Sequence, residues 1–154
     1  MVASLKNLTE EDFYKLNLPI LFGERITNRR FAILTNGQQT FGLAWGSHLM
    51  DPIITEISLN VFGVGIDQYY SIANFTMGGI ELTLSLTYNF VCATVISETL
   101  FIITEVEIVK VNTITFEVVE EYGLPGPFRE MSVKNNMLEI KCTGIDFIVE
   151  LNAI

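Results

Sequence analysis

The one histidine of the chain lies in a segment whose residue types could support acid–base chemistry. His48 stands in WGSHLMDP, beside Ser47 and Asp51. A serine, a histidine and an aspartate act as a nucleophilic triad when a fold brings them within hydrogen-bond reach. Here all three share one short, turn-like segment, and a histidine next to an aspartate in a turn is usually an ordinary turn residue. The sequence therefore predicts no catalytic residue here.

Other chemical signatures are equally weak. A zinc site needs closely spaced ligands, whereas Cys92 and Cys142 are far apart and the chain has a single histidine. VFGVGIDQ holds two glycines without the G-x-G-x-x-G or Lys-Ser/Thr pattern of a phosphate loop. We therefore predict no metal and no cofactor. Carboxylates such as Glu105 and Glu107 alternate along strands, which is typical of a solvated face. A glycosidase-type pair remains open, and with it an acid–base enzyme as a third function class.

Two segments could bind a protein partner. Arg25, Arg29 and Arg30 form the only basic cluster of an acidic chain. They could hold an acidic partner, or pair internally with Glu24 and residues 117–121, and the internal pairing is favoured.

The second segment is EEYGLPGPFRE, which combines two prolines, two glycines and two aromatic residues. Prolines lower the entropy cost of displaying a side chain, and aromatic residues favour the centres of interfaces. We assign Phe128 to the core of a linker between units, and keep Tyr122 as a candidate contact residue.

Charge and composition exclude several classes of partner. The chain has 9 basic and 18 acidic residues and a net charge of −9. Such a field repels nucleic acid and would suit a basic protein partner. Polar residues interrupt every apolar run before the ~18 residues of a membrane span are reached, so we expect no membrane association. The N-terminal MVASLKNLTEEDF lacks the apolar region of a signal peptide. With two cysteines expected as buried free thiols, this favours the cytoplasm.

The elements that would position these residues are mostly strands. Residues 1–18 are the one good helix candidate, with Thr9 as cap, Pro19 after its end, and a buried stripe of Leu8, Phe13 and Leu16. From residue 31 to 154 Val, Ile, Thr, Phe and Tyr alternate with turn signals. Asn36-Gly37 is the clearest hairpin among them.

An internal repeat runs through this strand-rich region. When the chain is laid on itself with an offset of 39, VFGVGIDQYYSIANF, from Val61, falls on LFIITEVEIVKVNTI, from Leu100. The same offset lays ITEVEIV, from Ile103, on CTGIDFI, from Cys142. Between these stretches, an offset of 38 places Leu86, Phe90, Val95 and Leu100 on Leu124, Phe128, Val133 and Leu138.

A period near 40 with several short strands per unit resembles the blades of β-propeller proteins. SETLFII and KNNMLEIK resemble the element that opens a blade's hairpin, and SLTYNF and GLPGPF resemble the link to the next blade. The resemblance covers about residues 53–152 and implies architecture only, since the Trp-Asp and Gly-His signatures of the best-known propeller repeat are missing. About two and a half units fit there, fewer than the four or more blades of a closed propeller.

These observations predict a single domain, residues 1–154, with an all-β fold. We expect an antiparallel meander of blade-like units, each of about 39 residues as is typical of such repeats, behind one short N-terminal helix. The alternative fold is a β-sandwich or barrel. The leading function is a non-catalytic protein-binding module, such as an inhibitor or immunity-type partner or a subunit of a larger assembly. The alternative is a carrier that encloses a small apolar ligand in a barrel cavity.

The last strand raises the prospect of a homodimer. In GIDFIVELNAI, Phe147, Ile148, Val149 and Leu151 are apolar, which makes a poor solvent-facing edge. We expect either the N-terminal helix or a second subunit to cover Phe147 and Val149.

Overall fold

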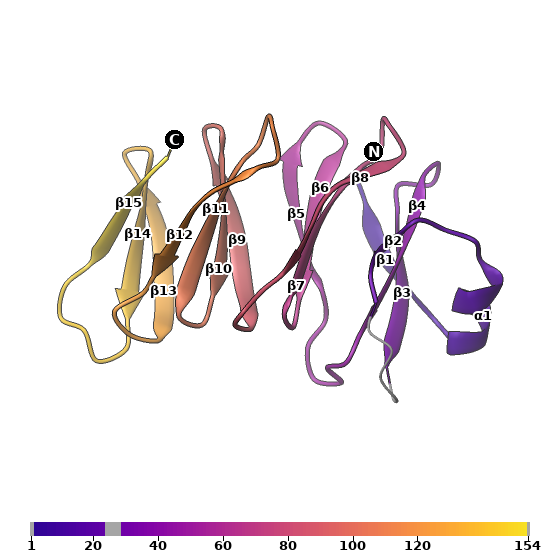
Figure 1. Ribbon diagram of the computed structural model, residues 1–154, viewed down its shortest axis with the longest axis horizontal. Coiled ribbons are helices and arrows are strands. Elements are labelled where there is room, and N and C mark those ends of the chain that lie inside the picture. Colours follow the sequence, from indigo (N-terminus) through magenta and orange to yellow (C-terminus); the bar gives the residue numbers. More distant parts are fainter. Residues whose placement is uncertain (1, 24–28, 154) are drawn as a thin grey trace. The chain divides into compact units, whose positions relative to one another are not determined.

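The computed structural model describes residues 2–23 and 29–153, and most of these residues lie in strands (Figure 1). This confirms the all-β fold class.

The described strands form four open sheets, none of which closes on itself. Sheet A holds, in spatial order, β1 (Ser4–Leu8), β3 (Arg30–Thr35), β4 (Thr40–Trp45) and β2 (Ile20–Phe22). Sheet B holds β5 (Ile53–Ser58), β6 (Val61–Ile66), β7 (Tyr69–Asn74) and β8 (Gly79–Ser85). Sheet C holds β9 (Phe90–Ile96), β10 (Thr99–Thr104), β11 (Glu107–Asn112) and β12 (Val118–Gly123). Sheet D holds β13 (Phe128–Lys134), β14 (Met137–Cys142) and β15 (Val149–Asn152).

The chain divides into two compact units, Met1–Thr87 with sheets A and B, and Tyr88–Ile154 with sheets C and D. Each unit has its own buried apolar cluster. That the chain behaves as one domain stays a prediction. Among the described residues, no helix has both the length and the apolar character needed to cross a bilayer.

The N-terminal segment differs from the prediction. The helix α1 spans only Glu10–Lys15, and residues 4–8 instead form β1, which pairs antiparallel with β3. Thr9 is the cap as predicted, since its side chain accepts a hydrogen bond from the Asp12 N–H at 3.1 Å. The helix ends because Leu16 takes an extended conformation, and Leu16 is 43% exposed rather than buried.

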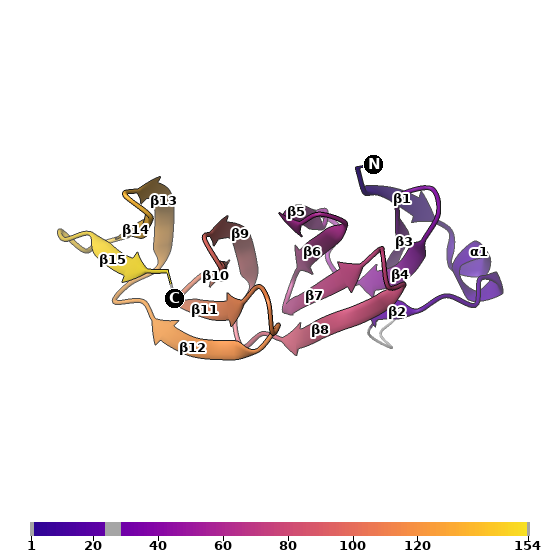
Figure 2. The same ribbon diagram turned by 90° about the horizontal axis from the view of Figure 1, so that it is seen from above.

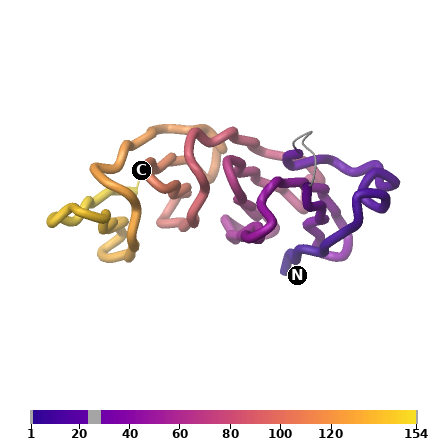
Figure 3. Tube along the Cα trace, turned by 90° about the horizontal axis from the view of Figure 1, so that it is seen from below, coloured from indigo at the N-terminus to yellow at the C-terminus, as the bar shows by residue number. Residues whose placement is uncertain are grey.

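Helix α1 covers one face of sheet A. Phe13 is buried against Phe31 and Ala44, and Leu8 packs at the margin of this cluster. Gly42 permits this approach, because a Cβ at Gly42 would lie 3.0 Å from the Phe13 ring. In Figure 3 the indigo N-terminal segment runs into the coil of α1. Phe13 is thus used within unit 1, as the predicted buried residue of the helix.

The other face of sheet A packs on sheet B. Phe41, Leu43 and Trp45 from β4 meet Phe62 and Val64 from β6 in one buried cluster. Sheet A departs from the expected antiparallel meander, because β2 pairs parallel with β4. Sheets B and C do form meanders, in which each strand pairs with the next one along the chain (Figure 2).

The blade-like repeat is confirmed by strand pairing that recurs from sheet B to sheet C. Val61 pairs with Asn74 between β6 and β7, and Thr99 pairs with Asn112 between β10 and β11, so both numbers rise by 38. Loop hydrogen bonds recur with the same offset: Leu86 N–H donates to the Gln68 carbonyl at 2.7 Å, and Leu124 N–H donates to the Val106 carbonyl at 2.8 Å. The sequence alignment with an offset of 38 is therefore correct. The two alignments with an offset of 39 are displaced by one position, which exchanges the faces of a strand.

Sheet D differs from sheets B and C in its burial pattern. All residues of β6 and of β10 are buried. In β14 burial alternates: Leu138 and Ile140 are buried in the cluster of unit 2, whereas Glu139 and Lys141 face away from it. The far face of sheet D is therefore a polar surface.

Candidate binding surface

The predicted arginine cluster is mostly used inside unit 1. Arg30 forms an ion pair with Asp51 at 2.6 Å, donates to the Met50 carbonyl at 3.1 Å, and lies 4.9 Å over the Trp45 ring. Internal pairing is thus what the structure shows for Arg30, although its partner is Asp51 rather than the glutamates expected from the sequence.

Arg29 is held in a similar way. Its guanidinium donates to the Tyr14 hydroxyl and lies 5.1 Å from the centre of the Phe31 ring. Both arginines keep further N–H donors beyond these contacts, because a guanidinium has five. Arg25 lies outside the described residues.

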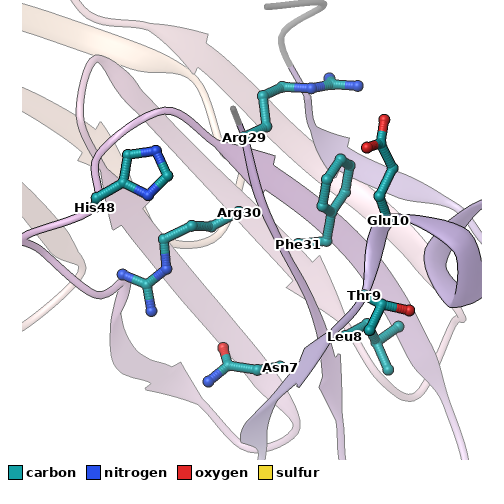
Figure 4. A pocket seen from close by; sticks show the side chains of 8 residues that line it. All are labelled: Asn7, Leu8, Thr9, Glu10, Arg29, Arg30, Phe31 and His48. Carbon is teal, nitrogen blue, oxygen red and sulfur yellow. The ribbon is translucent and has the colours of Figure 1, made fainter. Parts of the chain in front are cut away.

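Between the arginines the surface is hollowed over about 620 Å³. Figure 4 shows Arg30 beside His48 on one side of this arginine hollow, and Arg29, Phe31 and Glu10 on the other. The charges of Arg30 and Asp51 offset each other, and Glu10 adds a carboxylate at the rim. The hollow is thus lined by groups of both signs around an aromatic ring. Its lining is completed by Asn7, Leu8 and Thr9.

The segment beside the hollow, residues 46–51, is here called the His48 loop. Hydrogen bonds fix its backbone near both ends. Asp67 accepts from the Gly46 and Ser47 N–H groups at 3.1 and 3.0 Å. The Ser47 hydroxyl in turn accepts from the N–H groups of Leu49 and Met50, at 3.3 and 3.1 Å. The Met50 carbonyl then accepts from two side chains of sheet A, at the end of β4 and the start of β3.

Two of the three residue types of a triad make other contacts in this loop. The Ser47 hydroxyl is a hydrogen-bond acceptor for the loop backbone, and Asp51 is the ion-pair partner of Arg30. His48 is exposed at the hollow. The three residues therefore shape a loop, in agreement with the prediction of an ordinary turn.

The fixed loop displays two apolar side chains that the sequence interpretation passed over. Leu49 is 95% exposed and Met50 is 53% exposed. The available signal was an apolar pair inside a segment otherwise made of turn residues, GSH and DP. Tyr14, which is 60% exposed, accepts a hydrogen bond from Arg29, one of the residues that line the hollow.

The remaining predicted contact residues belong to unit 2 and lie at different depths. Tyr122 is half-buried and packs against the core cluster of unit 2. Phe147 is 61% exposed in the loop before β15, whereas Val149 is 6% exposed and belongs to the core. Phe128 also packs against this cluster, as predicted.

The two cysteines are both free thiols, as predicted. Cys142 is buried, whereas Cys92 is half-buried rather than fully buried. Burial raises the pKa of the Cys92 thiol, which keeps it in the protonated and less reactive form.

Comparison with known proteins finds a similarity of structure and no match of sequence. At the level of sequence, no family model and no curated protein matches the chain. Among solved structures, the chain is similar to BamB from Moraxella catarrhalis, with 12% sequence identity and a TM-score of 0.49. The match covers 83% of this chain and 41% of the BamB chain, so this chain spans less than half the length of that protein.

Proposed function

We propose that this chain is a non-catalytic protein-binding module, with the contact surface centred on Leu49, Met50 and His48 beside the arginine hollow. The observation that carries the proposal is the contrast within the His48 loop. Its backbone is fixed by side chains from three other places in unit 1, yet Leu49 is 95% exposed. An apolar side chain held so firmly in water contributes nothing to the core of its own unit.

Rigidity is what gives this surface its value for binding. A loop that is already fixed loses little conformational entropy when a partner binds, so more of the contact energy appears as affinity. The surface also has two residue types that are enriched at interface centres, methionine and arginine. Met50 follows Leu49 in the loop, and the guanidinium of Arg30 donates to the Met50 carbonyl.

The partner we propose is a basic protein, in an inhibitor or immunity-type complex or in a larger assembly in the cytoplasm. The net charge of −9 supports this, because opposite charge raises the rate of encounter. The mixed charges of the hollow supply hydrogen bonds at the contact, and the apolar loop supplies buried area.

Site-specific photo-cross-linking tests the surface. A photoreactive amino acid replaces Leu49 in one variant and Leu59 in a matched control. Leu59 is also a highly exposed leucine of unit 1, at 83%, but lies in the β5–β6 turn. In the native host we expect position 49 to capture one discrete protein that position 59 does not. Equal capture at both positions, or capture at neither, contradicts the proposal.

A further inference from the structure

The outer edge of β15 is open in the described part of the chain. In sheet B this edge of the third strand is occupied by β8, and in sheet C by β12. In sheet D the order is β13-β14-β15, and no described strand pairs with β15 on its far side. Unpaired N–H and C=O groups along such an edge are a template for another strand.

The third strand of sheet D otherwise matches those of its sister sheets. Asn112 pairs with Thr99 at the start of β10, and Asn152 pairs with Met137 at the start of β14. Asn152 thus takes the place of Asn112 and, in sheet B, of Asn74. Two residues of β15, Val149 and Leu151, are buried in the core of unit 2, so the strand is held in place without a fourth strand.

A row of side chains across each sheet shows what a fourth strand would meet. In sheet B, Ile72 of β7 stands opposite Leu82 of β8, an apolar pair. In sheet C, Lys110 takes the place of Ile72 and stands opposite Glu120 of β12, with 3.5 Å between the ammonium and the carboxylate. Each fourth strand therefore complements the third-strand residue beside it.

In sheet D the same row carries two like charges. Glu150 stands at the place of Lys110, directly opposite Glu139 of β14. Like charges in directly opposite positions destabilise a sheet. No lysine or arginine among the described residues forms an ion pair with Glu150. A cation on the open side of β15 would relieve this repulsion.

One apolar residue at the same edge indicates a second residue type that a fourth strand would carry. Ile148 precedes Val149 as Ile108 precedes Val109 in sheet C. Ile108 is buried in the core cluster of unit 2 and stands opposite Tyr122 of β12, which packs against the same cluster, whereas Ile148 is 45% exposed. An aromatic residue in a fourth strand would stand opposite Ile148 as Tyr122 stands opposite Ile108.

We propose that the outer edge of β15 binds an extended segment of another polypeptide as an antiparallel fourth strand. The segment carries a lysine or arginine opposite Glu150 and an apolar or aromatic residue two positions later, over Ile148. This β15 edge lies in unit 2 and goes beyond the Leu49 surface of the proposed function. A second copy of the chain fits the edge less well, because antiparallel pairing of two β15 strands brings Glu150 toward its counterpart between molecules of charge −9.

Two synthetic peptides test the proposal on the full chain. One copies Val118–Gly123 of β12, and the other is the same peptide with Glu120→Lys, which moves the charge opposite Glu150 from negative to positive. Backbone amide shifts of the 15N-labelled chain report where each peptide binds and how tightly. We expect the lysine peptide to shift the amides of residues 147–152 and to bind at least fivefold more tightly there than the glutamate peptide.

Charge reversal of the edge provides the decisive comparison. In Glu150→Lys the preference should invert, so that the glutamate peptide binds more tightly. Glu121→Lys, at an exposed glutamate of β12, changes the net charge equally and should leave the preference unaltered. Methylation of alternate peptide nitrogens, which removes the ladder donors, should weaken binding at least tenfold.

Three results would overturn the proposal. In the first, the peptides shift only amides that lie outside residues 147–152. In the second, Glu150→Lys still prefers the lysine peptide. In the third, the peptide binds equally well whichever alternate set of its backbone nitrogens is methylated. A dimer of the free chain whose interface amides are those of residues 149–152 would also overturn it, because the edge would then belong to a second copy.

Discussion

Sheets B and C have the same strand order and the same register over their last three strands, yet they fill one core position in different ways. In sheet B, Gly63 of β6 leaves room for the ring of Tyr70 from β7, and a Cβ at Gly63 would lie 2.6 Å from Tyr70 Cζ. In sheet C the corresponding residues are Phe101 of β10 and Ile108 of β11, both fully buried. The large ring comes from the third strand in one sheet and from the second strand in the other.

This difference shows what the repeat conserves. The register of the last three strands and the loop hydrogen bonds are kept, whereas the residue type at each position is not. Close packing allows this, because one strand can supply the ring for which its neighbour leaves room. Residue identity is consequently a poor guide to equivalence between the sheets.

The largest expected effect on stability comes from adding the phenylalanine of sheet C at the equivalent position of sheet B while Tyr70 is still present. Gly63→Phe should lower the free energy of unfolding by more than about 3 kcal/mol, because two rings compete for one space. Tyr70→Ile alone should cost about 2–4 kcal/mol through the cavity it leaves. The double variant copies the pair of sheet C and should recover at least about 2 kcal/mol of the summed loss. Urea unfolding followed by the fluorescence of Trp45, buried in unit 1, measures all three. Additive losses would show that the two positions do not share a space.

A second, smaller effect concerns the pair that differs between the sheets, Ile72 with Leu82 in sheet B and Lys110 with Glu120 in sheet C. Lys110 is 7% exposed, so Glu120→Leu leaves a buried ammonium without its carboxylate partner. This should lower the free energy of unfolding by about 1–3 kcal/mol. The double variant Lys110→Ile with Glu120→Leu copies sheet B and should return to within about 1 kcal/mol of the wild type. Urea unfolding followed by far-ultraviolet circular dichroism makes the comparison. A double variant no more stable than Glu120→Leu would mean that the two sheets do not share this environment.

The smallest effect is a pH dependence specific to sheet B. Burial raises the pKa of the Tyr70 phenol, and a hydrogen bond with Thr55 lowers it by less. Because the folded-state pKa lies above the unfolded value of about 10, this contribution to stability is complete below pH 10 and is lost as the pH rises through the folded-state pKa. Above pH 10 the wild type should lose up to about 1.4 kcal/mol per pH unit through this group. Tyr70→Phe should flatten the slope of stability against pH measured by urea unfolding above pH 10. A slope in Tyr70→Phe equal to that of the wild type would contradict this assignment.

The fold class and the repeat were accessible from the sequence because they depend on patterns that neighbouring residues share. Period-two alternation and turn residues predicted strands after residue 31, and the spacing of Leu86 and Leu124 matched the repeat unit of the structure. Sheet A was not accessible in this way. Residues 4–8 read as part of a helix, and only pairing with β3, far along the chain, makes them a strand. The parallel partner of β4 is a similar long-range choice.

The candidate surface was likewise predictable from the sequence only in part. Internal pairing was the favoured expectation for the arginine cluster and is seen as an ion pair for Arg30, whereas its partner, Asp51, lies 21 residues away and was not among the glutamates expected. Leu49 resembles any core leucine in a sequence, and its exposure depends on hydrogen bonds from other parts of unit 1 that fix the loop outward. Val149 illustrates the opposite case, since its apolar side chain was assigned to a partner and belongs to the core of unit 2.

The central claim, that the Leu49 surface binds a protein, is tested most directly by an equilibrium affinity. The protein captured by position 49 is purified and titrated against the wild type, Leu49→Asp and Leu59→Asp by calorimetry. Both variants add one negative charge at a highly exposed leucine, so neither should disturb the fold and each changes the net charge equally. We predict that Leu49→Asp weakens the affinity at least tenfold and that Leu59→Asp changes it less than twofold. Equal affinities for the two variants would contradict the claim.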